Sequence, residues 1–224
     1  GLIPPDPDFI AAVVETARHY GILVICDEVL NIRQSYRGAS ARYGIEPDLI
    51  AAGKTIGGGF PIGAIGGSRR VMSVFDGSAG RAKVAQGGTF SANPVSMVAG
   101  RVSMEAMTEP AFARLEAMGD RLRAALTAAI DRHRAHYVIS GAASLFRIHP
   151  KGTLPHDYRE AYPLPDETAS MKKMTRFFRN EGVILPAGAA ACLSTAMSDV
   201  DIDKIADVFE RFLTTTPVSA GEAR

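Results

Sequence analysis

The sequence has few cysteines, no long apolar run and no excess of either charge. Cys26 and Cys192 are too few for the disulfide framework of a small secreted protein, and they suit a reducing cytoplasm. No apolar run approaches the ~20 residues that a membrane-spanning helix needs. Lys and Arg number 25 against 24 Asp and Glu, so the charge balance favours no polyanionic partner. These counts predict a cytoplasmic, globular protein that binds neither membrane nor nucleic acid.

The first residues also lack two features. The segment from Gly1 to Pro5 has no initiator methionine and no signal sequence with a charged start and an apolar centre. We therefore expect that further residues precede Gly1 in the natural protein.

The first hundred residues alternate helix and strand signals. Asp6 and Pro7 are typical of a helix start, and Gly21 is typical of a helix end. A continuous apolar run over 22–26 predicts a strand covered on both faces, and 48–52 predicts a second one. The glycine-rich stretch 53–67 is interrupted by large apolar residues, which indicates close backbone packing rather than a flexible linker.

The remaining residues predict a smaller α+β unit. The expected elements are helices over 93–107 and 110–133, strands over 137–140 and 145–149, a loop over 150–165, a helix over 167–180, a short strand over 183–185 and a last helix over 200–213. Residues 1–108 would then form an α/β domain with a mostly parallel sheet and helices on both faces. Residues 109–214 would form the small domain and 215–224 a tail. The first sheet looks incomplete, because only two or three strands are predicted for it.

Two polar residues follow the predicted strands of the first domain. Asp27 comes directly after the first apolar run and Lys54 shortly after the second. Ligands of open α/β sheets bind beyond the carboxyl ends of strands, so an acid and a lysine there converge on one crevice. A buried lysine in such a crevice becomes a neutral amine that can form a Schiff base. A purely structural ion pair between Asp27 and Lys54 is the alternative.

The sequence gives weaker support to three other kinds of site: a catalytic carboxylate pair, a nucleotide-binding loop and a metal site. Asp27 and Glu28 are adjacent and should point to opposite sides, which disfavours a glycosidase-like carboxylate pair. The glycines at 57–59 lack the spacing of a nucleotide-binding loop. His133 and His136 are three residues apart, but no third metal ligand is evident, so we expect no metal.

Three segments resemble one known family: VICDEV at 24–29, PDLIAAGKTIGGGFPIGA at 47–64 and GTFSANP at 88–94. They are similar to the class III aminotransferases of fold type I, which depend on pyridoxal 5′-phosphate (PLP). The nearest match is the branch that contains glutamate-1-semialdehyde aminomutase. The resemblance is specific up to about residue 108 and looser from there to the last helix.

The resemblance implies a role for four residues. Lys54 would form the Schiff base with PLP, and Asp27 would pair with the pyridine nitrogen. Val29 would pack on the ring. Thr89 would hold the cofactor phosphate of the partner subunit in a homodimer, although it could instead cap the helix that begins near Asn93.

Two departures from the family qualify this reading. The main phosphate loop and the ring-stacking aromatic residue belong to an upstream half that this chain lacks, so the isolated chain should be inactive. Residues 186–191 have no charged side chain where the aminomutase has an acidic residue. This absence favours a transaminase that moves an amino group from an amino acid, with a β-amino acid as one option, to a keto acid. An aminomutase, a non-catalytic fragment and a cofactor-free aldolase using Lys54 are the alternatives, and Arg33 is a weaker candidate for binding a substrate carboxylate.

Overall fold

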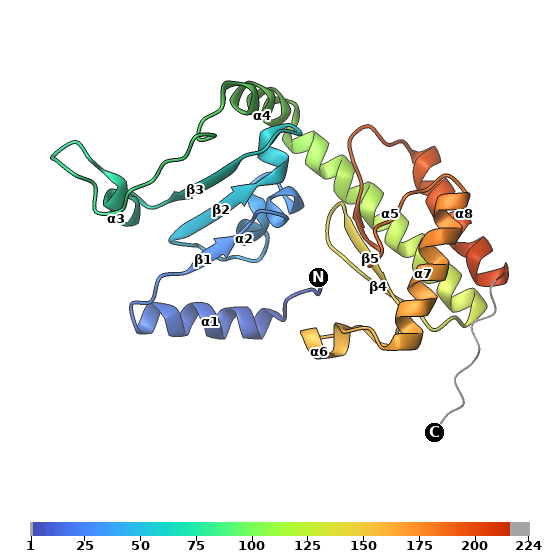
Figure 1. Ribbon diagram of the computed structural model, residues 1–224. Coiled ribbons are helices and arrows are strands. Elements are labelled where there is room, and N and C mark those ends of the chain that lie inside the picture. Colours follow the sequence, from blue (N-terminus) through green and yellow to red (C-terminus); the bar gives the residue numbers. More distant parts are fainter. Residues whose placement is uncertain (1, 216–224) are drawn as a thin grey trace. The chain divides into compact units, whose positions relative to one another are not determined.

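The computed structural model describes residues 2–215 and divides them into two compact units (Figure 1). One unit contains residues 6–112, and the other contains residues 2–5 together with 113–215. The predicted tail lies outside the described residues from position 216 onward. Among the described helices, none has the length and apolar character needed to cross a membrane.

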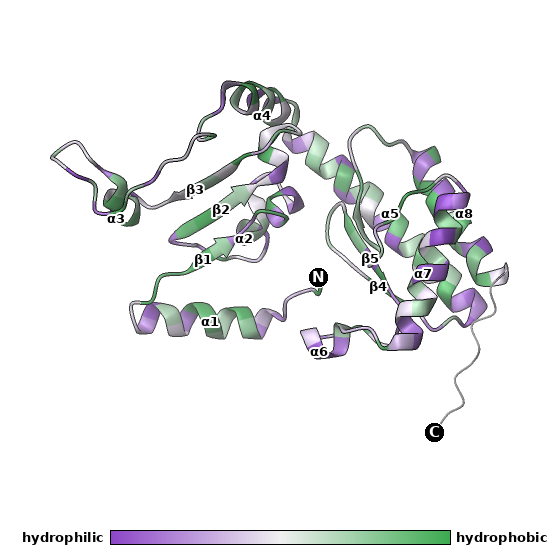
Figure 2. Ribbon diagram, viewed as in Figure 1, coloured by the Kyte–Doolittle hydropathy of each residue, from purple (hydrophilic) through white to green (hydrophobic). Residues whose placement is uncertain are grey.

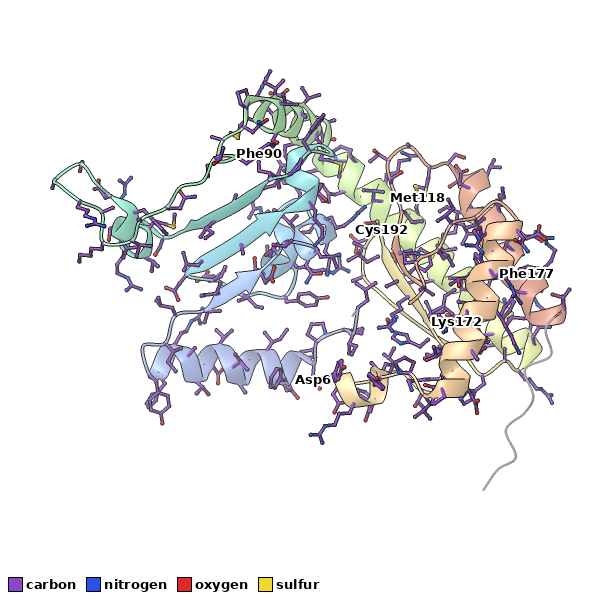
Figure 3. The ribbon with its side chains drawn as sticks, in the orientation of Figure 1. Asp6, Phe90, Met118, Lys172, Phe177 and Cys192 are labelled. Atoms are coloured by element: carbon purple, nitrogen blue, oxygen red, sulfur yellow. The ribbon has the colours of Figure 1, made fainter. Side chains whose placement is uncertain are left out.

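The first unit opens with helix α1 (Pro7–His19). Its N-cap is Asp6, labelled in Figure 3, whose carboxylate accepts hydrogen bonds from the amides of Asp8 and Phe9 at 2.8 and 3.1 Å. Gly21 follows the helix with a φ of +65°, a left-handed conformation that glycine adopts without strain. Both predicted ends of this helix are confirmed.

A three-stranded sheet follows, in the order β1 (Ile25–Asp27), β2 (Leu49–Gly53) and β3 (Gly63–Gly67). Strands β1 and β2 are parallel, whereas β3 pairs antiparallel to β2. The α/β class is therefore confirmed, but in this chain the sheet is mixed. β3 was not predicted, because three of its five residues are glycine, which is depleted in strands.

The expectation that the first strand is covered on both faces is wrong for this chain. Figure 2 shows hydrophobic residues along β1 and β2, yet Ile25 on β1 is 63% exposed and Ile65 on β3 is 56% exposed. The strand is also shorter than its apolar run, beginning at Ile25 instead of Ile22. A residue at the edge of a three-stranded sheet has few neighbours to cover it, which explains the exposure.

Helical segments lie between these strands and after the last of them. Between β1 and β2 lie the 3-10 turn η1 (Asn31–Gln34) and helix α2 (Gly38–Arg42). After β2 come η2 (Lys54–Gly57), α3 (Arg69–Met72), η3 (Ser73–Phe75) and α4 (Pro94–Ala106), with β3 between η2 and α3.

The glycine-rich segment after β2 packs backbone to backbone against α4. A Cβ added at Gly58 would lie 2.3 Å from the Ala99 carbonyl oxygen, and one added at Gly100 would lie 2.2 Å from the Ile56 carbonyl oxygen. The hydroxyl of Ser96, which is buried, donates to the carbonyl of Pro61 at 2.8 Å. The predicted close packing of this segment is confirmed, and only glycine permits it at these two positions.

The second unit contains a separate antiparallel sheet, in the order β4 (Val138–Ser140), β5 (Leu145–His149) and β6 (Ala190–Cys192). Its helices are α5 (Glu109–His133), α6 (Tyr158–Ala161), α7 (Pro165–Asn180) and α8 (Asp199–Thr215). Leu122, Ile148, Phe178 and Phe209 are completely buried in its core. The unit thus has the α+β character expected of it.

One strand of this unit was predicted in the wrong place. Residues 183–185 are not a strand, and Ile184 is 86% exposed. The third strand is β6, which pairs its alanines and Cys192 with Leu145, Phe146 and Arg147 of β5. Alanine has little intrinsic preference for strands, so the pairing with β5, and not local sequence, determines this element.

We predict that Gly100→Ala destabilises residues 6–112 by about 1–3 kcal/mol, the usual cost of overpacking. Alanine is the better helix former by about 1 kcal/mol, so any loss must come from the contact with Ile56. Glu105→Ala, which removes an exposed side chain of the same helix that pairs with Arg101, is the control. Hydrogen exchange of the Phe60 amide, which donates to Gly57, measures the effect. Equal exchange in both variants would show that the contact is not tight.

Candidate active site

Asp27 and Lys54 stand at the carboxyl ends of adjacent parallel strands. β1 ends at Asp27, which pairs in register with Ala51 of β2. β2 ends at Gly53, and Lys54 is the next residue. Because the two strands are parallel, both residues lie at the same edge of the sheet, and both are exposed there. The expected convergence of these two backbone positions is therefore present.

The backbone of Lys54 has an unusual conformation. Its φ is +49°, in the left-handed region that side-chain-bearing residues seldom adopt. The chain changes at this residue from the extended conformation of β2 to the tight turn of η2, which packs against α4 through Gly58 and Gly100. Such backbone strain persists only where surrounding contacts enforce it, and it is concentrated at functional sites. No feature of the sequence indicated it.

The alternative of a structural ion pair is not supported. Within residues 2–215, Lys54 and Asp27 form no salt bridge with each other. Asp27 instead accepts a hydrogen bond at Oδ1 from the Val29 amide at 3.0 Å. The expectation that Lys54 is buried is not met in this chain, because Lys54 is exposed.

Val29 lies beside the last residue of β2. A Cβ added at Gly53 would be 3.4 Å from Cγ1 of Val29 and 3.3 Å from the carbonyl oxygen of Ile62. Gly53 is buried, so Val29 packs on the residue that immediately precedes Lys54. Asp27, Val29 and Lys54 are thus gathered at one edge of the sheet.

Glu28 points away from this group, as its place between Asp27 and Val29 predicts. Its carboxylate is buried at the start of α2, where it accepts hydrogen bonds from the amides of Ala39 and Ser40, both at 2.8 Å. The hydroxyl of Ser40 donates to the same carboxylate at 2.5 Å. Asp27 and Glu28 therefore cannot act as a facing carboxylate pair.

Cys26, the residue before Asp27, is a free thiol that is half-buried. Burial, and secondarily the negative charge of Glu28, raise the pKa of the Cys26 thiol above its ordinary value. A higher pKa keeps the thiol protonated and therefore poorly nucleophilic at neutral pH.

Thr89 lines a hollow that Lys54, Asp27 and Val29 do not line. It is exposed in the turn that precedes α4, which also holds Phe90 (Figure 3), and it lines a hollow of about 650 Å³. Neither Lys54 nor Asp27 is among the lining residues. The alternative role of Thr89 as a helix cap is wrong, since Asn93 caps α4 by accepting from the amides of Val95 and Ser96 at 3.0 and 3.3 Å.

The remaining candidates lie elsewhere. Arg33 is half-buried on the wall of a pocket of about 200 Å³ that Glu28 and Tyr36 also line. His133 contacts Glu210 at 3.1 Å between Nε2 and Oε1. In the described part of the chain, no cluster of three metal-ligating side chains occurs.

Comparison with known proteins places the chain in a family. The model of the family described as "Aminotransferase class-III" matches residues 1–215. Among curated proteins, a glutamate-1-semialdehyde 2,1-aminomutase of Methylacidiphilum infernorum is 35% identical over 92% of this chain and 47% of its own length.

Two solved structures are also similar. An omega-transaminase from Sphaerobacter thermophilus is 39% identical with a TM-score of 0.92, and the match covers 96% of this chain and 49% of that one. A β-phenylalanine aminotransferase from Variovorax paradoxus is 30% identical with a TM-score of 0.90 and the same coverage. The chain thus spans about half the length of the relatives it matches. Its match over residues 1–215 shows that this chain belongs to the class-III aminotransferase family.

Proposed function

We propose that this chain forms part of a PLP-dependent aminotransferase and that Lys54 is its cofactor-binding lysine. The observation that carries the proposal is the placement of Lys54 and Asp27 at the carboxyl ends of two adjacent parallel strands. Fold class alone would not assign this function, because one fold serves many reactions. A lysine that forms no ion pair within residues 2–215, together with a carboxylate at the end of the neighbouring strand, is the combination that PLP requires.

Each of the two residues has a separate chemical task. The amine of Lys54 would hold PLP covalently through its aldehyde group and would move the proton to and from the substrate Cα. Asp27 would lie against the pyridine nitrogen and keep it protonated. When bound, PLP would supply an electron sink for the negative charge that develops at Cα. Val29, which packs on Gly53, would cover one face of the ring.

Thr89 is proposed to bind the cofactor phosphate of a second copy of the chain. Its hollow does not include Lys54 or Asp27 of its own chain, which fits a role across a dimer interface. The helix that follows, α4, has an uncovered apolar stripe: Val95, Val98 and Val102 recur at helical spacing and are each more than half exposed. A homodimer would cover this stripe and bring Thr89 to the partner's site.

The substrate proposed is an amino acid that gives its amino group to a keto acid. The similarity to a β-phenylalanine aminotransferase supports a β-amino acid as donor. The alternative is an aminomutase, which the similarity to glutamate-1-semialdehyde aminomutases supports. Residues 186–191 offer no acidic side chain, and this favours the transaminase.

The proposal includes an upstream half of the enzyme. Residues 1–108 would be the C-terminal portion of the PLP-binding large domain, and 109–214 the small domain. The exposed Ile25 and Ile65 of the sheet are surfaces that such a half would cover. Without it, the phosphate would lose its main loop amides, and we expect the isolated chain to be inactive. The two free cysteines support a cytoplasmic location.

We predict that Lys54→Ala abolishes covalent attachment of PLP in the dimer that contains both halves. Borohydride reduction of the loaded enzyme, followed by peptide mapping, should label Lys54 in the wild type and leave the variant unlabelled. Lys83→Ala, which removes an exposed lysine from the same unit, is the control and should keep the label. A label on Lys83 or Lys151 in the wild type would contradict the assignment.

A second prediction concerns Thr89. Mixing a Lys54→Ala protomer with a Thr89→Ala protomer should give heterodimers with one intact site, and thus about half of the wild-type activity per dimer. The control pairs Lys54→Ala with the double variant Lys54→Ala/Thr89→Ala and should stay inactive. If sedimentation confirms the first heterodimer and it is also inactive, Thr89 does not serve the partner's site.

A further inference from the structure

Within residues 2–215, the hydrogen-bond partners described for the buried carboxylate of Glu28 are all donors. Glu28 is 2% exposed, and its two oxygens accept from the amide of Ala39, the amide of Ser40 and the hydroxyl of Ser40. A glutamine at this position would turn its NH₂ group toward at least one of these donors and leave that donor without a partner. The site therefore requires a carboxylate and not merely a polar side chain.

The backbone around Glu28 is shaped to this carboxylate. Gly38 precedes Ala39 with a φ of +85°, and a Cβ added there would lie 2.3 Å from Oε2 of Glu28. Gly44, at the other end of α2, has a similar φ of +67°, yet an added Cβ would meet nothing within 4 Å. Position 38 thus requires glycine for two reasons. The φ is positive, and the Glu28 carboxylate occupies the space that a side chain would need.

Glu28 also fixes the backbone on both of its sides. Its amide donates to the carbonyl of Ala51 on β2 at 2.8 Å, and its carbonyl accepts from the amide of Ile32 in η1 at 3.1 Å. The two residues that flank it are Asp27 and Val29, joined by the hydrogen bond from the Val29 amide to Asp27. Any rotation of the chain at Glu28 would therefore move Asp27 and Val29, which lie at the same end of the sheet as Lys54.

We propose that Glu28 is a positioning residue: its carboxylate, anchored in the first turn of α2, sets the direction in which Asp27 and Val29 face the cofactor. The proposal rests on the function proposed above and deepens it. Glu28 touches neither substrate nor cofactor, since its side chain lies on the other side of β1. Its contribution is to hold the Asp27–Val29 hydrogen bond in one geometry before any ligand arrives.

The test uses the dimer that contains both halves and compares Glu28→Gln and Gly38→Ala with the control Gly44→Ala. The first measurement is hydrogen exchange of the Val29 amide in the cofactor-free protein. We expect the Val29 amide to exchange about tenfold faster in Glu28→Gln and in Gly38→Ala, because each variant disturbs the hydrogen bonds of the Glu28 carboxylate. In Gly44→Ala we expect little change apart from the destabilisation that a positive φ causes in alanine. The second is steady-state turnover, where kcat should fall about tenfold while KM for the amino donor stays nearly unchanged.

A compensating double variant separates positioning from general damage. Glu28→Asp withdraws the carboxylate by one methylene and makes room for the methyl group of Gly38→Ala. The double variant Glu28→Asp/Gly38→Ala should therefore recover slow Val29 exchange and most of kcat relative to Gly38→Ala alone. This comparison also remains informative if Glu28→Gln does not fold.

Equal Val29 exchange and equal kcat in Gly38→Ala and Gly44→Ala, with no recovery in the double variant, would overturn the proposal. Failure of the proposed function gives a different result. In that case borohydride reduction of the wild-type enzyme attaches no PLP to Lys54. The hydrogen exchange of the Val29 amide still reports whether Glu28 holds Asp27 and Val29 in place.

Discussion

The backbone contact between the segment after β2 and helix α4 is the constraint on which the site depends. Gly58 and Gly100 allow two carbonyl groups to approach where any Cβ would collide. This contact forces the chain to turn sharply directly after β2, and Lys54 takes up the turn in a left-handed conformation. The backbone position of Lys54 is therefore constrained by Gly58, four residues further along the chain, and by Gly100, which is far from it in sequence.

The second constraint is the alternation of side chains at the end of β1. Asp27 and Val29 face one side, where Lys54 emerges, and Glu28 faces the other, where α2 begins. One short segment thus carries Asp27, the proposed cofactor ligand, and Glu28, the proposed positioning residue. The two neighbouring carboxylates differ in exposure, which follows from this alternation and agrees with the different roles proposed for them.

The sequence predicted the parts of this structure that depend on local chemistry. Asp6 begins a helix because its side chain accepts hydrogen bonds from free amides of the first turn. The helix start at Asn93 was also predicted, although Thr89 and not Asn93 was the candidate for its cap. The edge position of Asp27 and Lys54 followed from two apolar runs and the rule that ligands bind beyond strand ends. The parts that depend on distant pairing were missed: β3 is rich in glycine, β6 is mostly alanine, and the φ of Lys54 comes from a contact with α4. The roles proposed for the four site residues rest on family resemblance together with their placement.

The central claim is that Asp27, at the end of β1, pairs with the pyridine nitrogen of a PLP held by Lys54. It is tested most directly by nitrogen NMR of the dimer containing both halves, loaded with PLP labelled with ¹⁵N in the ring. The wild type should show the chemical shift of a protonated ring nitrogen. Asp27→Asn should keep the cofactor bound but show the shift of an unprotonated one, because an amide cannot supply the stabilising charge. An unprotonated ring in the wild type, or a protonated ring in both proteins, would contradict the account.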